Sequence, residues 1–206
     1  MTDLGLTVCR SKDTTFSAYL NYFLYLWTLK NTSPKTTSME SPYQKDVIDF
    51  VTVSVQTCLL LEHVAELEKD DFVEKLLIYL PLLYVKTRAL GKAETNSEGS
   101  NPTCVTEEDY NFISEGVRQI MGDDDAYLEV FMQDMQYSDR PITAFLSENI
   151  ADIYQELKNM AFNYQQENTA VMLEAVNTCI ETFYEYWGQK LLNALRALHN
   201  INNQNR

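Results

Sequence analysis

The run LLIYLPLLYV, from Leu76 to Val85, is apolar on every side when it is wound into a helix. A surface helix needs a polar face, so this run predicts that the helix from Phe72 to Leu90 is the central and most buried element of the fold. Pro81 lies inside the run and lacks a backbone N–H, which predicts a kink or a break in that helix.

The segments on both sides of this run also have helical periodicity. Apolar residues from Val47 to Leu59 repeat at i, i+3, i+4 and i+7, which predicts a helix that continues to about Glu68. Further helices are expected from Thr106 to Met121, from Asp123 to about Met135, from about Ser147 to Gln165, and through a long last segment that carries Val176 to Leu198. With no convincing β pattern, we expect an all-α fold: a single bundle of about six helices, with a further helix in the N-terminal segment.

The net charge of the chain excludes some classes of binding partner. The 206 residues carry 16 Lys and Arg against 30 Asp and Glu, a formal charge of -14. A wide basic surface for nucleic acid cannot be built from so few cations, and an anionic membrane would repel the chain. We therefore expect no nucleic-acid partner and no membrane partner.

The charge is unevenly divided along the chain. Residues 1–38 carry 4 basic and 2 acidic side chains, whereas residues 39–206 carry 12 basic and 28 acidic ones. The apolar segment Phe16–Leu29 would reach only about 21 Å as a helix, too short to span a bilayer, and it lacks the flanks of an export signal. We interpret residues 1–38 as an N-terminal extension, either a helix that caps the domain or a segment upstream of a natural start at Met39, and residues 39–206 as one acidic, cytoplasmic all-α domain.

Four segments of this domain resemble a known family. They are DVIDFVTVSVQTC (46–58), FVEKLLIYLPLLY (72–84), residues 124–160 with DDAYLEVFMQDMQYSDRPITAFLSENIADIYQELKNM, and YWGQKLLNALRALH (186–199). Across about residues 43–200 the chain resembles a family of small bacterial proteins catalogued as domain of unknown function five-zero-six-three. The resemblance implies a helical, cytoplasmic protein and no particular activity.

Residue patterns of the familiar enzyme classes are missing from the sequence. The four cysteines form no CxxC pair, the two histidines form no HExxH or ExxH motif, and no glycine-rich phosphate loop or GxSxG is present. Cys58 and Cys179 fall on or beside apolar stripes, so we expect them to be buried and reduced.

Carboxylates are the remaining candidates for chemistry. Glu62 and Glu66 are one turn apart on one predicted helix, and Glu148 and Asp152 are one turn apart on another. Two such pairs could hold Mg²⁺ for nucleotide-phosphate hydrolysis, loosely resembling the all-α pyrophosphatases, although the ExxE and ExxD motifs of those enzymes are not reproduced. Against this, Glu148, Asp152 and Glu156 centre about 130° from the apolar stripe of their helix, which favours a solvated acidic face. Glu62 follows a core-facing stripe, which indicates either the protein edge or a polar pocket.

The last predicted helix offers a second candidate. Trp187, Lys190, Asn193 and Arg196 could form a small anion-binding pocket with Trp187 as its wall, whereas pairing of Lys190 and Arg196 with carboxylates would simply fix helix packing.

The lack of familiar enzyme motifs in the sequence favours a non-catalytic protein-interaction module with an unknown protein partner and no cofactor. Two alternatives stay open: a Mg²⁺-dependent hydrolase of nucleotide phosphates, and an acidic mimic of nucleic acid.

Overall fold

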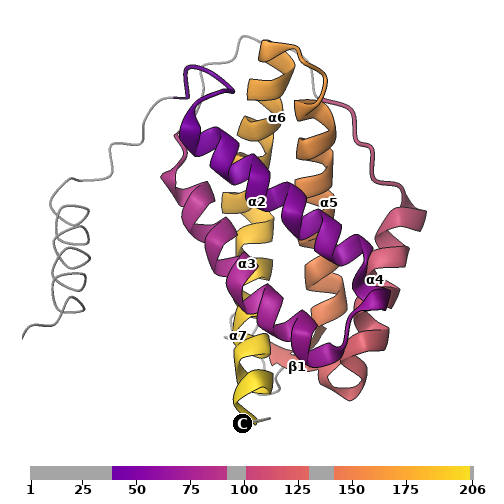
Figure 1. Ribbon diagram of the computed structural model, residues 1–206. Helices are drawn as coiled ribbons and strands as arrows, with labels where there is room; N and C mark the ends of the chain where they lie inside the picture. The colour runs from indigo at the N-terminus through magenta and orange to yellow at the C-terminus, as the bar shows by residue number, and fades with distance from the viewer. Residues whose placement is uncertain (1–38, 92–100, 130–141, 205–206) are drawn as a thin grey trace, which may run out of the picture. The chain divides into compact units, whose positions relative to one another are not determined.

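The structure is a helical bundle with one small strand pair. The computed structural model describes residues 39–91, 101–129 and 142–204 (Figure 1). Its helices are α2 (Lys45–Glu62), α3 (Lys69–Ala89), α4 (Glu107–Met121), α5 (Leu146–Tyr164), α6 (Thr169–Thr182) and α7 (Gly188–Gln204). Shorter elements are η1 (Val64–Glu66), η2 (Gly122–Asp125), β1 (Ala126–Glu129), β2 (Ile142–Phe145) and the π-helical segment η4 (Phe183–Trp187). The all-α prediction with about six helices is confirmed.

The segment 1–38 lies outside the described residues, so the N-terminal helix and the domain boundary at Met39 stay predictions. The first residues that are described pack on the bundle. Met39 is buried, and the Tyr164 hydroxyl donates to the Pro42 carbonyl oxygen at 2.6 Å. None of the helices in the described ranges is both long and apolar enough to cross a membrane.

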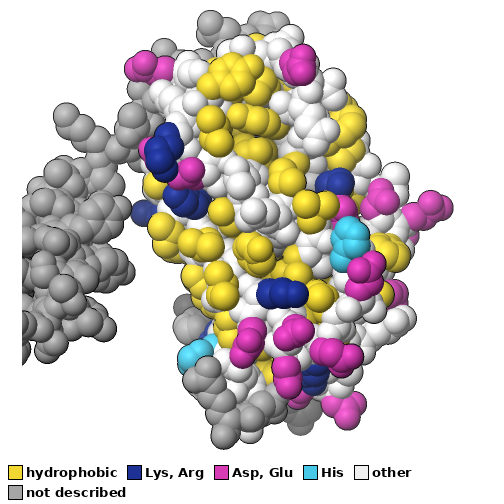
Figure 2. Space-filling view, viewed as in Figure 1, with side chains coloured by type: hydrophobic (Ala, Val, Ile, Leu, Met, Phe, Trp, Pro, Cys, Tyr) yellow, Lys and Arg dark blue, Asp and Glu magenta, His cyan; other side chains and the backbone are white. Residues whose placement is uncertain are grey.

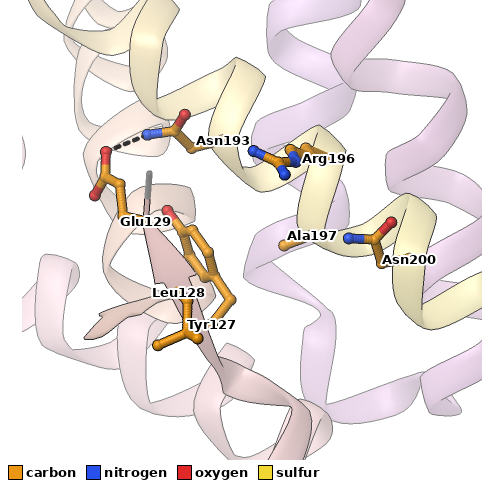
Figure 3. Close-up of a pocket in the computed structure, with 7 residues that line it drawn as sticks. All are labelled: Tyr127, Leu128, Glu129, Asn193, Arg196, Ala197 and Asn200. Carbon is orange, nitrogen blue, oxygen red and sulfur yellow. Dashed lines mark hydrogen bonds between the residues drawn. The ribbon is translucent and has the colours of Figure 1, made fainter. Parts of the chain in front are cut away.

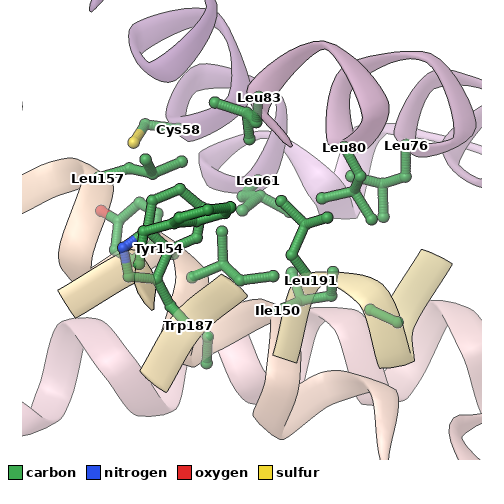
Figure 4. Close-up of a cluster of buried hydrophobic side chains, with 14 of the residues drawn as sticks. Cys58, Leu61, Leu76, Leu80, Leu83, Ile150, Tyr154, Leu157, Trp187 and Leu191 are labelled. Carbon is green, nitrogen blue, oxygen red and sulfur yellow. The ribbon is translucent and has the colours of Figure 1, made fainter. Parts of the chain in front are cut away.

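Helix α5 is the centre of the bundle. It packs against α2, α4, α6 and α7, and Figure 1 shows α2 crossing in front of it. The main core lies around this helix: Ile150, Tyr154 and Leu157 of α5 meet the side chains of α2, α3 and α7 (Figure 4). Trp187 is fully buried in the same core, where its indole N–H donates to the Cys179 carbonyl oxygen at 2.9 Å.

Helix α3 is not the central element that its composition predicts. Ile78 and Val85 are each 61% exposed and Leu82 is 40% exposed, while Leu76, Leu80 and Leu83 are buried against α2 and α7. Pro81 does not break the helix, which runs through it from Lys69 to Ala89. The prediction of an all-round buried central helix is therefore wrong, because α3 lies on the outside of the bundle and has only one covered side. Of the kink or break predicted at Pro81, the break is absent.

The acidic run Asp123–Asp125 does not open a helix. Gly122, with φ of 58°, ends α4 in a left-handed conformation, and η2 leads into β1, which pairs antiparallel with β2 from Ala126 opposite Phe145 to Glu129 opposite Ile142. Asp125 is buried and accepts hydrogen bonds from the Ser147 N–H (2.7 Å) and hydroxyl (2.8 Å) at the start of α5. The expected fourth helix is wrong as far as Glu129; the rest of it lies in 130–141, outside the described residues.

The start of α4, expected at Thr106, is fixed by local capping. Thr106 accepts from the Asp109 N–H at 3.1 Å, and Asp109 accepts from the Thr106 N–H at 2.9 Å, which completes a capping box for α4. Asp70 and Asp71 lie in the first turn of α3, where negative charge is favourable to the helix dipole.

The polar stretch 92–105 connects α3 to α4. Residues 92–100 lie outside the described residues, but its last residues are attached to α5. The Asn159 side chain accepts from the Cys104 and Val105 N–H groups at 2.8 and 3.1 Å, and the Asn163 amide donates to the Pro102 carbonyl oxygen at 2.8 Å. These bonds hold the approach to α4 against the bundle.

The long last helix changes its winding in the middle. Helix α6 continues through the π-helical segment η4 into α7. Gly188 is required there, since a Cβ atom at this position would lie 2.4 Å from the Phe183 carbonyl oxygen. The small residue allows the close approach that the widened turn creates.

Candidate functional site

The four candidate metal ligands do not meet around one point. Glu62, in the last turn of α2, accepts from Lys158 Nζ at 2.6 Å and from the Tyr154 hydroxyl at 3.0 Å. Asp152 instead accepts from the Tyr110 hydroxyl at 3.0 Å and lies 3.5 Å from Lys190 Nζ. Glu66 in η1 and Glu148 in α5 are exposed. Within the described ranges, no group of three or more His, Cys, Asp and Glu side chains is placed to hold a metal ion.

The predicted solvated acidic face of α5 is also wrong for two of its three residues. The side chain of Asp152 is only 14% exposed, and Tyr110, Tyr186 and Lys190 surround it. Burial and the hydrogen bond to Asp152 raise the pKa of Tyr186. Glu156 is half-buried and accepts from the Thr182 hydroxyl at 2.7 Å. These carboxylates join α5 to α4 and to the last helix, so they fasten the bundle.

Of the four residues predicted to form a pocket on the last helix, two line a cavity. Asn193 and Arg196 line a cavity of about 260 Å³ between α7 and β1, together with Tyr127, Leu128, Glu129, Ala197 and Asn200 (Figure 3). The Asn193 amide donates to the Glu129 carboxylate. Lys190 does not line this cavity, because it pairs with Asp152 and lies over the Tyr186 ring. Trp187 is not a pocket wall, because it is fully buried in the core.

A larger feature lies where α2, α5 and the start of α4 meet. Two hollows of about 220 and 270 Å³ share Glu62 and Lys158 as lining residues, and we call them together the Glu62 groove. The first hollow is walled mainly by apolar side chains of α2 and α5: Val55, Leu59, Ala161 and Phe162. The second lies toward α4 and is lined by Cys104, Val105, Asp109, Phe112 and Tyr154. The groove thus has an ion pair in the middle and apolar surface on both sides.

Three large apolar side chains stay exposed around this groove. Leu59 is 50% exposed, Phe162 40% and Phe112 60%. Single exposed apolar residues are ordinary, but three that line one pair of adjoining hollows mark a surface suited to binding. Figure 2 shows the face with α2 in front, where hydrophobic side chains spread over the middle and acidic ones gather at the lower end.

The pKa values of four side chains in the groove, Lys158, Tyr154, Cys58 and Cys104, are raised. The hydrogen bond from Lys158 to Glu62 raises the pKa of the lysine, and burial, followed by the bond to Glu62, raises the pKa of Tyr154. Burial raises the pKa of Cys58 to about 12 and also raises the pKa of Cys104. At neutral pH these thiols and this hydroxyl are protonated and the amine is charged, so none of them is an activated nucleophile.

The buried, free state of Cys58 and Cys179 agrees with the prediction for them. The sequence did not single out Phe112 or Phe162, although each is an aromatic residue beside the apolar stripe of its helix. Such a position indicates an exposed aromatic side chain. It does not show that two of them, 50 positions apart in the chain, line one groove.

Comparison with known proteins supports the family and the fold. Residues 41–204 match the family described as Domain of unknown function (DUF5063). The chain is also similar to a solved structure, the crystal structure of protein BF1032 from Bacteroides fragilis, a structural genomics target. The two share 37% sequence identity with a TM-score of 0.70, over 78% of this chain and 94% of that one. No curated protein matches. The chain therefore belongs to the DUF5063 family, as its sequence segments predict.

Proposed function

We propose that this protein is a non-catalytic, cytoplasmic protein-interaction module that binds a segment of another protein in the Glu62 groove. The observation that carries the proposal is the exposure of Leu59, Phe112 and Phe162 around two adjoining hollows. An amphipathic segment laid into an apolar groove is a common mode of peptide recognition, and its apolar anchors fill hollows of this kind.

The energetics suit a reversible contact. Complete burial of a fully exposed leucine or phenylalanine stabilises a complex by about 1.5–3 kcal/mol, so each half-exposed side chain contributes about 1 kcal/mol. The ion pair between Glu62 and Lys158 is already formed across 2.6 Å and needs no rearrangement before binding. A preorganised groove of this kind supports binding without a large ordering cost.

A site-specific photo-crosslinker tests the proposal. Benzoylphenylalanine is placed at Phe112, at Phe162, or at the control position Val85, which is 61% exposed on α3 and lines neither hollow. In extract of the source cells, we expect one partner of the same mass to be crosslinked from the two groove positions and not from position 85. Equal crosslinking from all three positions, or crosslinking from position 85 alone, would overturn the proposal.

A further inference from the structure

The charges around the Glu62 groove restrict what it accepts. Its lining includes two carboxylates, Glu62 and Asp109, and one cation, Lys158. Lys158 is matched by Glu62 at 2.6 Å, and no other lysine or arginine of the described part lines either hollow. Lys158 also attracts Asp109, but it is one cation against two carboxylates, so negative charge is in excess in the groove lining.

Asp109 carries its charge throughout the physiological range. Hydrogen bonds from the backbone and the side chain of Thr106 lower its pKa. Glu107 and Glu108 are exposed in the same first turn of α4, and Glu66 is exposed in η1, just after the end of α2. Glu66 is one turn beyond the lining residue Glu62 in the chain, and Glu107 and Glu108 directly precede the lining residue Asp109, so these carboxylates add to the negative potential of a chain whose net charge is -14.

We infer that the occupant of the groove is a cationic amphipathic segment of a partner protein, with apolar side chains in the two hollows and Lys or Arg side chains against Asp109, Glu108 and Glu66. This inference rests on the proposed function and names the chemistry of its partner. The apolar contacts supply affinity, and the complementary charges select the partner and speed its approach. An acidic or phosphorylated segment is repelled by the same carboxylates.

Three labelled synthetic peptides of equal length test this on the full chain by fluorescence anisotropy. One is an amphipathic leucine/lysine helix, one is its leucine/glutamate counterpart, and one is a serine/lysine peptide without apolar residues. We expect the leucine/lysine peptide to bind at least about tenfold more tightly than either of the others at low salt, and less tightly as salt screens the charges.

Matched variants separate groove binding from general attraction to an acidic protein. Phe112→Ser and Phe162→Ser are each expected to weaken binding of the leucine/lysine peptide about threefold to tenfold, whereas Val85→Ser leaves it unchanged. The double variant Glu66→Gln/Glu108→Gln weakens the same binding at low salt, whereas Glu185→Gln, exposed in η4, does not. Circular dichroism confirms that each variant is folded.

Two results would overturn the inference: equal affinity for the leucine/glutamate and leucine/lysine peptides, or leucine/lysine binding that is insensitive to both phenylalanine variants. If crosslinking from positions 112 and 162 still captures one partner in either case, the groove remains an interaction site and only its cationic preference is wrong. If crosslinking fails at both positions, the proposed function and this inference are both wrong.

Discussion

Helices α3 and α5 show how poorly composition alone predicts position. Helix α3 contains the most apolar run of the described chain, yet only 6 of its 21 residues are buried. Helix α5 has a mixed composition, yet 11 of its 19 residues are buried, including the polar Ser147, Asn149 and Asn163. The difference is the number of neighbours: α5 has helices on several sides, whereas α3 packs mainly against α2 and α7. Hydrophobicity measures the cost of exposing a side chain, and packing decides whether that cost is avoided.

The sharpest test compares one aliphatic side chain from each helix. Leu157→Ala in α5 removes a side chain that is 0% exposed and is expected to lower the free energy of unfolding by about 3 kcal/mol, because it leaves a cavity. Ile78→Ala in α3 removes one that is 61% exposed and should change it by less than about 1 kcal/mol. Urea denaturation measures both. Similar losses would mean that α3 is covered in solution.

A second test removes the cap that starts α5. Asp125→Ala deletes the acceptor of two hydrogen bonds from Ser147 and leaves the buried Ser147 N–H without its partner. The expected loss is about 2 kcal/mol by urea denaturation. Asp123→Ala is the control, since Asp123 is exposed, and it should cost less than about 0.5 kcal/mol. Equal losses would show that net acidity at this turn matters more than the cap.

On α3, Pro81→Ala should stabilise the protein. The alanine restores an N–H donor inside an unbroken helix, and this gain exceeds the greater freedom of the unfolded chain, for a net increase of about 1–2 kcal/mol. Thermal melting measures it. A lower melting temperature would show that the proline ring itself is needed where it lines a shallow surface hollow with Leu77, Leu192 and Leu195.

The smallest expected effect on stability depends on pH and concerns the ion pairs of Asp49, which join the first half of α2 to the end of α3. Asp49 accepts from Lys45 at 2.7 Å and from Lys86 at 2.8 Å, and these bonds lower its pKa from 3.8 to about 2. Because the folded pKa is below the unfolded one, the contribution is complete above about pH 5 and is lost as the pH falls toward 2. The melting temperatures of Asp49→Asn and the parent should differ at pH 6 and converge near pH 2. A gap that stays constant with pH would rule out this ion pair as the cause.

Much of the fold could be predicted, because helix periodicity and capping are local. The Thr106–Asp109 capping box and the apolar stripe of α4 need only neighbouring residues. The strand β1 could not be predicted in this way, because its partner β2 begins 13 residues after it ends and Asp125 is committed to Ser147 of another helix. The acidic run Asp123–Asp125 was expected to open a helix, but Asp125 instead accepts hydrogen bonds from Ser147, 22 positions later.

The candidate site was less predictable than the fold. Glu62 was recognised as unusual on a core-facing stripe, but its partners Tyr154 and Lys158 lie 92 and 96 positions later. Trp187 was expected at a pocket and is buried instead, because the π-helical segment and Gly188 place it in the core. Phe112 and Phe162 belong to separate helices, and their common groove exists only when α4 and α5 are packed together.

By itself, the sequence determined the helical class, most helix boundaries, the negative charge and the family, since each depends on composition or on residues within a few positions of one another. The tertiary structure alone decided which apolar residues are covered, which carboxylates pair with cations, and where a groove remains. The physical reason is that a side chain is buried or paired only when a second part of the chain packs against it. Here these partners come from segments far apart in the sequence, such as those of Glu62 and Lys158.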